Sequence, residues 1–69
     1  MKPTAHFIAR CAERGISQDD VQRVLDTADE RDAGDNGNVV LTGWASRGRR
    51  LTVVVTGDHN TLITAYYRT

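Results

Sequence analysis

Apolar and polar residues in the first half of the chain repeat with the period of two short amphipathic helices. Over residues 4–14, Thr4 is a suitable N-cap because its hydroxyl can accept a hydrogen bond from a free amide of the first turn. Gly15 suits the left-handed residue that ends a helix, and Ile16 can then fold back on the apolar side. That apolar side of the first helix is predicted to carry Phe7, Ile8, Cys11 and Ala12.

A second helix is predicted to begin after Ser17. Asp20 stands at the capping-box position, and Asp19 favours the positive end of the helix dipole. The two helices would form a short hairpin hinged at residues 15–17. The buried face of the second helix is predicted to consist of Val21, Val24, Leu25 and Ala28.

The second half of the chain has the pattern of β-strands. Residues 29–38 are polar and charged and contain Gly34 and Gly37, which predicts a mobile loop. Runs rich in β-branched and aromatic residues follow at 39–45, 50–56 and 61–67. Residues 46–49 and 57–60 between them have turn chemistry, so two successive hairpins are expected.

Together these elements predict a single α+β domain over residues 1–69, in the order α-α-β-β-β. We expect a three-stranded antiparallel meander with the helical hairpin packed on one face. Leu51, Val53 and Val55 would face the helices, and Trp44, the only tryptophan, is expected in the core. A meander leaves two free edges through which another protein could pair, and a homodimer could form through an edge strand or through Trp44.

Composition narrows the class of protein. Nine basic and nine acidic side chains balance, so no global charge draws the chain to nucleic acid or membrane. The single cysteine, Cys11, cannot form an intrachain disulfide, and with two histidines it makes a four-ligand zinc site unexpected. No apolar run is long enough to span a bilayer. The residues after Met1 do not form the apolar stretch of a signal peptide. The sequence also contains no P-loop and no dinucleotide-binding motif. We therefore expect a cytoplasmic protein without membrane contact, metal or cofactor.

The balanced charge is unevenly distributed. Residues 17–38 are acidic, whereas residues 1–16 and 39–69 are basic. In one interpretation the acidic residues coat a solvated helix and loop. In the other, the two basic ends meet in space and form one cationic face.

The first helix carries the most informative arrangement of polar residues. His6, Arg10 and Arg14 follow one another at four-residue spacing, which places them in a stripe beside the apolar side of the helix. Two arginines beside a histidine suit phosphate binding combined with proton transfer near neutral pH. The alternative is three ordinary solvated side chains.

Two further groups of residues suit contact with nucleic acid. The turn after Trp44 carries three arginines around a glycine, namely Arg47, Arg49 and Arg50. In one interpretation these arginines contact phosphate groups. In the other they keep the turn soluble and discourage aggregation at exposed strands. As an alternative to its place in the core, Trp44 could stack on a nucleic-acid base. On the last strand, alternation places a hydroxyl, a phenol and a guanidinium on one face: Thr64, Tyr66 and Arg68.

The residues from His6 to Ser17 resemble the H-x-x-x-R-x-x-x-R-G-I-S opening of a family of small bacterial domains of unknown function. Residues 51–55 and 62–66 are similar to the closing strand pair of that family. The family is placed in the barnase, colicin and RelE-like (BECR) superfamily. The resemblance implies two helices packed on a curved antiparallel sheet.

Relatives in that superfamily include metal-independent ribonucleases of toxin–antitoxin systems. The resemblance therefore implies a site made of His6, Arg10, Arg14, Thr64 and Tyr66. In it, His6 would be the general acid or base and an arginine would stabilise the charged transition state. The RNA 2′-hydroxyl would attack its own neighbouring phosphate, so the reaction needs no metal.

Two functional hypotheses follow from the sequence. The first is a toxin-type endoribonuclease that acts on tRNA or mRNA and is held in check by an antitoxin. The alternative is a non-catalytic protein-interaction module, such as a regulator or inhibitor from a mobile element. In that case the acidic second helix or a free strand edge would bind the partner.

Overall fold

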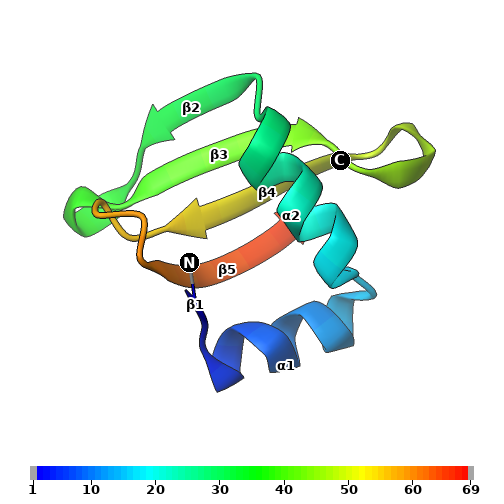
Figure 1. Cartoon of the computed structure of the whole chain (residues 1–69), viewed down its shortest axis with the longest axis horizontal. Helices are drawn as coiled ribbons and strands as arrows, with labels where there is room; N and C mark the ends of the chain where they lie inside the picture. Colours follow the sequence, from blue (N-terminus) through cyan, green and yellow to red (C-terminus); the bar gives the residue numbers. More distant parts are fainter. Residues whose placement is uncertain (1, 69) are drawn as a thin grey trace.

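The computed structural model describes residues 2–68 and contains two helices and a sheet (Figure 1). The chain order is β1, α1, α2, β2, β3, β4 and β5, with single 3₁₀ turns before β3 and β4. The helices are α1 (Ala5–Arg14) and α2 (Gln18–Thr27). The strands are β1 (Lys2–Pro3), β2 (Glu30–Ala33), β3 (Val39–Trp44), β4 (Arg50–Val55) and β5 (Thr61–Tyr67).

The sheet has the strand order β1-β5-β4-β3-β2. The pairs β2–β3, β3–β4 and β4–β5 are antiparallel, and the two-residue β1 pairs in parallel with the start of β5. A register shift between Val54 and Val55 marks a bulge in the β4–β5 pair. The α+β class is therefore confirmed, but the expected three-stranded sheet is wrong, because four antiparallel strands are present.

The strand that the sequence analysis missed is β2. It lies within residues 29–38, which were expected to form a mobile loop, and it pairs with β3 from Glu30↔Thr42 to Ala33↔Val39. All four of its residues are exposed, so no alternation of apolar and polar positions marks it in the sequence. Pairing with the partly buried β3 stabilises this strand, although its composition favours a loop.

Both helices begin after their predicted N-caps, and α1 ends at the predicted Gly15. The Thr4 hydroxyl accepts a hydrogen bond from Phe7 N at 3.0 Å, and Gly15 ends α1 with a φ of 68°. The Ser17 hydroxyl accepts one from Asp20 N at 3.1 Å and caps α2. The apolar side of α1 is narrower than predicted, since Phe7 and Cys11 are buried whereas Ile8 is 48% exposed.

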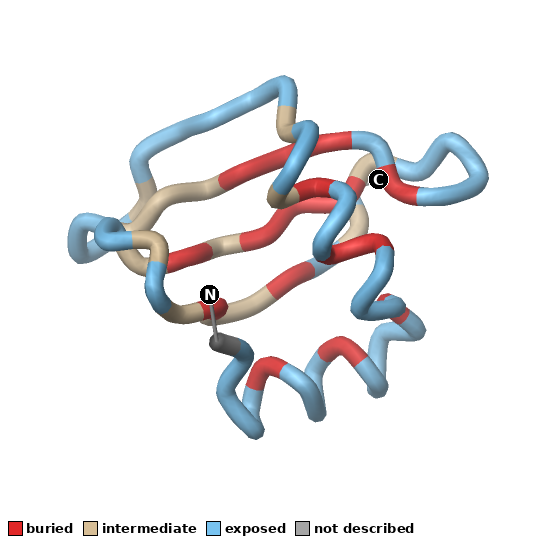
Figure 2. Tube along the Cα trace, in the orientation of Figure 1, coloured by how far each residue is buried: buried red, intermediate tan, exposed pale blue. Residues whose placement is uncertain are grey.

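The core lies between the helices and one face of the sheet (Figure 2). Leu51, Val53 and Val55 are fully buried there, as predicted. A Cβ added to Gly43 would lie 3.3 Å from the Ala28 Cα, so α2 approaches β3 closely at this point. From the helices the core receives Phe7, Cys11, Ile16, Val21 and Val24.

No helix within residues 2–68 covers the other face of the sheet, which we call the open face. Its middle row includes Thr42 and Thr52, which are buried and share a hydrogen bond of 2.9 Å between their hydroxyls. Trp44 and Tyr66 also lie on it and are 54% and 43% exposed. Trp44 therefore does not belong to the core as expected, because alternation along β3 places it opposite the helices.

No helix within residues 2–68 has the length and apolar character needed to cross a membrane.

Candidate nucleic-acid interface

The C-terminal end of α1 is joined to β5 by the Arg14 side chain. The Arg14 guanidinium donates to the Ala65 carbonyl at 2.8 Å and to the Thr64 hydroxyl at 3.2 Å. Because β1 pairs only with Thr61 and Leu62, the edge of β5 beside Ala65 has no strand neighbour within residues 2–68. Arg14 thus occupies part of that edge and reaches the Thr64 hydroxyl of the open face.

His6 and Arg10 continue from Arg14 along the exposed side of α1. Each is one helical turn from the next, so the three positions span about 12 Å of the helix axis. Arg10 bonds the exposed Glu13 at 3.3 Å, a type of surface ion pair that a ligand can displace at little cost. The His6 ring makes no hydrogen bond with another of the described residues. These residues therefore form a line along the helix and not a compact cluster.

The strand residues predicted for the interface share the open face. Pairing of Thr64 with Val54 and of Tyr66 with Thr52 places both on the face opposite the helices. Thr64 meets Arg14, whereas Tyr66 lies two residues further along β5. The candidate interface thus runs from α1, around the β5 edge and onto the open face, and it ends near Trp44 on β3.

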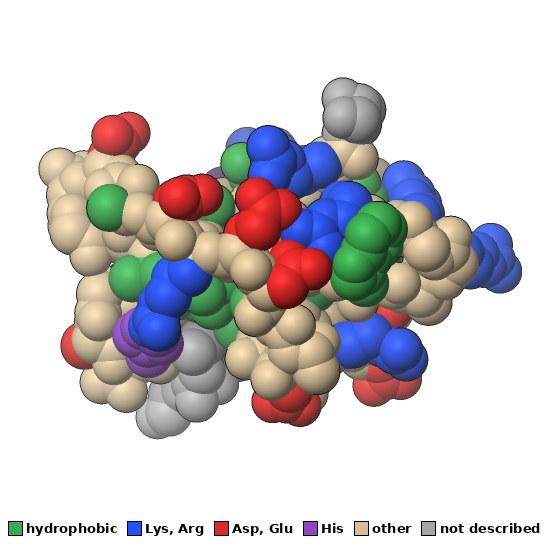
Figure 3. All heavy atoms as spheres, turned by 90° about the horizontal axis from the view of Figure 1, so that it is seen from above, with side chains coloured by type: hydrophobic (Ala, Val, Ile, Leu, Met, Phe, Trp, Pro, Cys, Tyr) green, Lys and Arg blue, Asp and Glu red, His purple; other side chains and the backbone are tan. Residues whose placement is uncertain are grey.

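The predicted nucleic-acid arginines divide into two groups. Arg50 forms a two-pronged ion pair with Asp29 and also bonds Glu30, while Arg68 lies 3.7 Å from Glu30. The hydrogen bond from Arg50 lowers the pKa of Asp29, and the same contact raises the pKa of Arg50. Viewed onto the β2 side of the molecule, acidic and basic side chains accordingly lie beside one another (Figure 3).

Arg50 also lies against the Trp44 ring, with its guanidinium carbon 4.6 Å from the ring centroid. Cross-strand pairing of Trp44 with Arg50 produces this contact. The guanidinium is therefore held by the carboxylates of Asp29, just before β2, and of Glu30, at its start, and also by an aromatic ring on β3. Its charge is largely compensated within the molecule.

Arg47 and Arg49 lie at the β3–β4 turn, which is attached to α2 by Asp20. Asp20 as a residue is 6% exposed, and its carboxylate accepts hydrogen bonds from Ser46 N at 3.2 Å and Ser46 Oγ at 3.0 Å. The Tyr67 hydroxyl donates to it at 3.4 Å, and Arg49 stacks 3.6 Å from the Tyr67 ring centroid.

We call the group of Asp20, Ser46 and Tyr67 the Asp20 latch. Burial alone would raise the pKa of Asp20, but the hydrogen bonds from Ser46 and Tyr67 outweigh it and hold the pKa below its ordinary value. The pKa of the Tyr67 phenol is raised, mainly by its burial and secondly by the negative charge of Asp20. Asp20 stays ionised at neutral pH and fixes the turn that carries Arg47 and Arg49.

Within residues 2–68 no three His, Cys, Asp or Glu side chains lie close enough together to hold a metal ion. Burial raises the pKa of the Cys11 thiol, which keeps it protonated at neutral pH. Cys11 is therefore a small buried residue of the core, as its place on the apolar side of the helix predicted.

Comparison with known proteins places the chain in a family. The family model described as "Domain of unknown function (DUF4258)" matches residues 4–67. The chain belongs to the DUF4258 family. No curated protein and no solved structure gives a significant match. The match covers both helices and strands β2 to β5 of this DUF4258 domain.

The sequence of this DUF4258 domain predicts part of the geometry of the candidate interface. It predicts the α1 stripe and the shared face of Thr64 and Tyr66, and the roles of these residues stay predictions. It does not predict the Asp20 latch, because a capping-box position suggests a local bond to the helix backbone, whereas the side chain of Asp20 turns to Ser46. The available sequence signal was spacing, because Asp20 lies four residues before Val24 and so shares the face of α2 that packs on the sheet.

Proposed function

We propose that this DUF4258 domain is a small RNA-binding protein of the RelE-like type that cleaves RNA without a metal. The observation that carries the proposal is the contact of Arg14 with Thr64 and the Ala65 carbonyl. Through it, the cationic stripe of α1 and the hydroxyl-bearing open face form one continuous surface. A polyanion with 2′-hydroxyls and exposed bases suits such a surface.

The spacing along α1 assigns different phosphates to different residues. His6 and Arg10 are one turn apart and can contact the same phosphate, whereas His6 and Arg14 are two turns apart and cannot. We assign the scissile phosphate to His6 and Arg10. Arg14 and Thr64 would hold the next phosphate of the strand and keep it in register.

In the proposed reaction the RNA 2′-oxygen forms a bond to the adjacent phosphorus as the bond from phosphorus to the 5′-oxygen breaks. His6 takes the 2′-hydroxyl proton or delivers a proton to the leaving 5′-oxygen, and Arg10 stabilises the added negative charge. The products are a 2′,3′-cyclic phosphate and a free 5′-hydroxyl. The reaction needs no co-reactant.

Two aromatic residues on the open face support RNA as the polyanion. Trp44 and Tyr66 are exposed to about half of their surface, although burying them would stabilise a small domain. Exposed rings on an uncovered sheet are suited to stacking with unpaired bases. Single-stranded regions of tRNA or mRNA therefore match this surface better than duplex does.

The test is incubation of purified protein with tRNA and total RNA in EDTA. Cleavage that leaves 2′,3′-cyclic phosphate ends and is lost in His6→Ala and Arg10→Ala would support the proposal. Arg23→Ala changes an exposed arginine of α2 and serves as the matched control. Cleavage that persists in both α1 variants would refute the assigned mechanism, and intact RNA throughout would refute the activity.

A second candidate function is a non-catalytic protein-interaction module, as expected for a regulator or inhibitor. It is favoured by β2, whose outer edge has no strand neighbour within residues 2–68 and whose four residues are all exposed. Such an edge can pair with a strand of another protein, for example an antitoxin, or with a second copy of this chain. A domain that expresses readily without a partner and leaves RNA intact would favour this candidate.

A further inference from the structure

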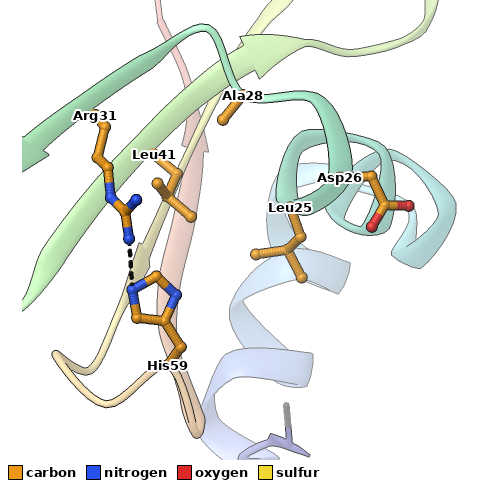
Figure 4. A pocket seen from close by; sticks show the side chains of 6 residues that line it. All are labelled: Leu25, Asp26, Ala28, Arg31, Leu41 and His59. Atoms are coloured by element: carbon orange, nitrogen blue, oxygen red, sulfur yellow. Dashed lines mark hydrogen bonds between the residues drawn. The ribbon is translucent and has the colours of Figure 1, made fainter.

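The helix side of the sheet contains a cavity that plays no part in the proposed RNA interface. It has a volume of about 200 Å³ and lies between α2, the β2–β3 pair and the β4–β5 turn (Figure 4). Its walls are apolar on one side and polar on the other. The lining residues are Leu25, Asp26, Ala28, Arg31, Leu41 and His59.

The cavity exists because the helix layer is narrower than the sheet. Helix α2 packs on β3 and β4, and β2 is left fully exposed. Leu41 therefore borders a space that neither α2 nor β2 fills, and Leu25 faces the same space from the helix (Figure 4). An opening with apolar walls and few polar groups is the general form of a small-molecule site.

The polar side of the cavity is formed by Arg31 and His59. Pairing of Arg31 with Leu41 places its side chain on the helix side of the sheet, and its guanidinium nitrogen lies 2.8 Å from His59 Nε2. A guanidinium can only donate, so His59 Nε2 is the acceptor and the ring proton resides on Nδ1. The backbone of His59 has a φ of 61° in the β4–β5 turn, and its backbone N–H donates to the Thr56 carbonyl at 2.8 Å. These features hold the residue in place.

The charge of Arg31 is not matched by a carboxylate. Among the described residues no Asp or Glu oxygen lies within 4.0 Å of it, in contrast to Arg50 and Arg68. Asp26 also borders the cavity, but its carboxylate accepts from Gln22 at 3.0 Å and points away from Arg31 (Figure 4). The cavity thus offers an uncompensated guanidinium beside an apolar wall.

From this juxtaposition we propose that the cavity binds a carboxylate carried by a small apolar group. The carboxylate accepts hydrogen bonds from Arg31, and the apolar group lies against Leu25 and Leu41. A free branched-chain acid and the C-terminal residue of a peptide share this chemistry. The site is independent of the RNA interface, which lies around α1, the β5 edge and the open face.

The experiment follows amide and methyl NMR signals of the whole chain during titration with two probes. One probe is 3-methylbutanoate, and the other is an N-acetylated tripeptide that ends in leucine. Saturable shifts centred on Leu25, Leu41 and His59 would support the site, and the probe that binds more tightly would identify the source of the carboxylate. The matched control probes are 3-methylbutanamide and the C-terminally amidated tripeptide.

Arg31→Gln should weaken binding about tenfold or more, because it removes a charge-assisted hydrogen bond. Arg31 is exposed, so this variant is expected to fold, and Arg23→Gln should leave binding unchanged. Equal binding of acid and amide would overturn the proposal. So would an Arg31→Gln variant with unaltered affinity, shifts centred on α1, or the absence of any saturable shift.

Discussion

Replacement of Asp20 by alanine should be among the most destabilising single changes in this domain. The substitution removes an almost fully buried carboxylate that accepts two hydrogen bonds from Ser46 and a longer one from Tyr67. A hydrogen bond to a charged group contributes about 1.5–3 kcal/mol, and one with weaker geometry contributes less. We therefore expect Asp20→Ala to lower the free energy of unfolding by about 2–4 kcal/mol, and to lower the melting temperature by about 10–30 °C.

The assay is urea unfolding at pH 7, monitored by circular dichroism, with Asp19→Ala as the matched control. Asp19 is the neighbouring residue in the same first turn of α2 and is exposed, so both variants lose a charge near the helix N-terminus. Only Asp20→Ala also loses the latch, whereas Asp19→Ala should stay within about 0.5 kcal/mol of the wild type. Equal destabilisation by the two variants would refute the reasoning.

The Asp20 latch also predicts how stability depends on pH. The pKa of Asp20 is lower in the folded chain than its ordinary value of 3.8. A carboxyl group of this kind contributes stability above its unfolded pKa, and that contribution is lost as the pH falls through the folded pKa. Wild-type stability should therefore decline below about pH 4. Asp20→Asn should show a smaller decline over the same window, and an unchanged pH profile in this variant would contradict the assignment.

Three further predictions concern the proposed RNA interface. Trp44→Ala should weaken binding of single-stranded RNA about 5- to 100-fold in fluorescence anisotropy, because each stacked base is worth about 1–3 kcal/mol. The melting temperature of this variant should stay close to that of the wild type. Unchanged affinity would exclude Trp44 from the interface. Glu30→Gln should strengthen RNA binding and steepen its salt dependence, because Arg68 loses its neighbouring carboxylate and becomes available for phosphate contact, whereas Arg50 keeps its ion pair with Asp29. Weaker binding would show that the Glu30 charge positions these arginines. Arg14→Ala should speed amide hydrogen exchange in β5, because the strand loses its attachment to α1 and opens more readily, whereas Arg14→Lys should restore part of the protection. Equal exchange in both variants would contradict this role.

The sequence predicted the elements that are determined by residues close together in the chain, namely the helix ends with capping residues and strand β5. Thr4 and Ser17 are N-caps as predicted, and Gly15 adopts the left-handed conformation that ends α1. The bounds of β5 are also those predicted from its run of β-branched and aromatic residues. In each case a side chain within a few residues decides the structure, so a short stretch of sequence contains the necessary information.

Features that depend on distant residues were not predictable in the same way. β2 exists because β3 pairs with it, and its exposed, charged residues give no strand pattern. The burial of Asp20 depends on Ser46, which is 26 residues away, and the exposure of Trp44 depends on which face the helices cover. For the interface, the sequence predicted that His6, Arg10 and Arg14 share a stripe. The contact of Arg14 with Thr64 spans 50 residues and could be expected only from the family resemblance.

The most direct test of the central claim is the affinity of a single-stranded RNA for variants on both sides of the Arg14 contact. The RNA is 2′-O-methylated so that it cannot be cleaved, and binding is measured by fluorescence anisotropy at several salt concentrations. If α1 and the open face form one RNA interface, Arg14→Ala, Arg10→Ala and Tyr66→Ala should each weaken binding, and Arg23→Ala should not. The two arginine variants should also reduce the salt slope by about 0.7 each, as expected for the loss of one phosphate contact to a single strand. Equal affinity in all four variants, or no binding by the wild type, would contradict the claim.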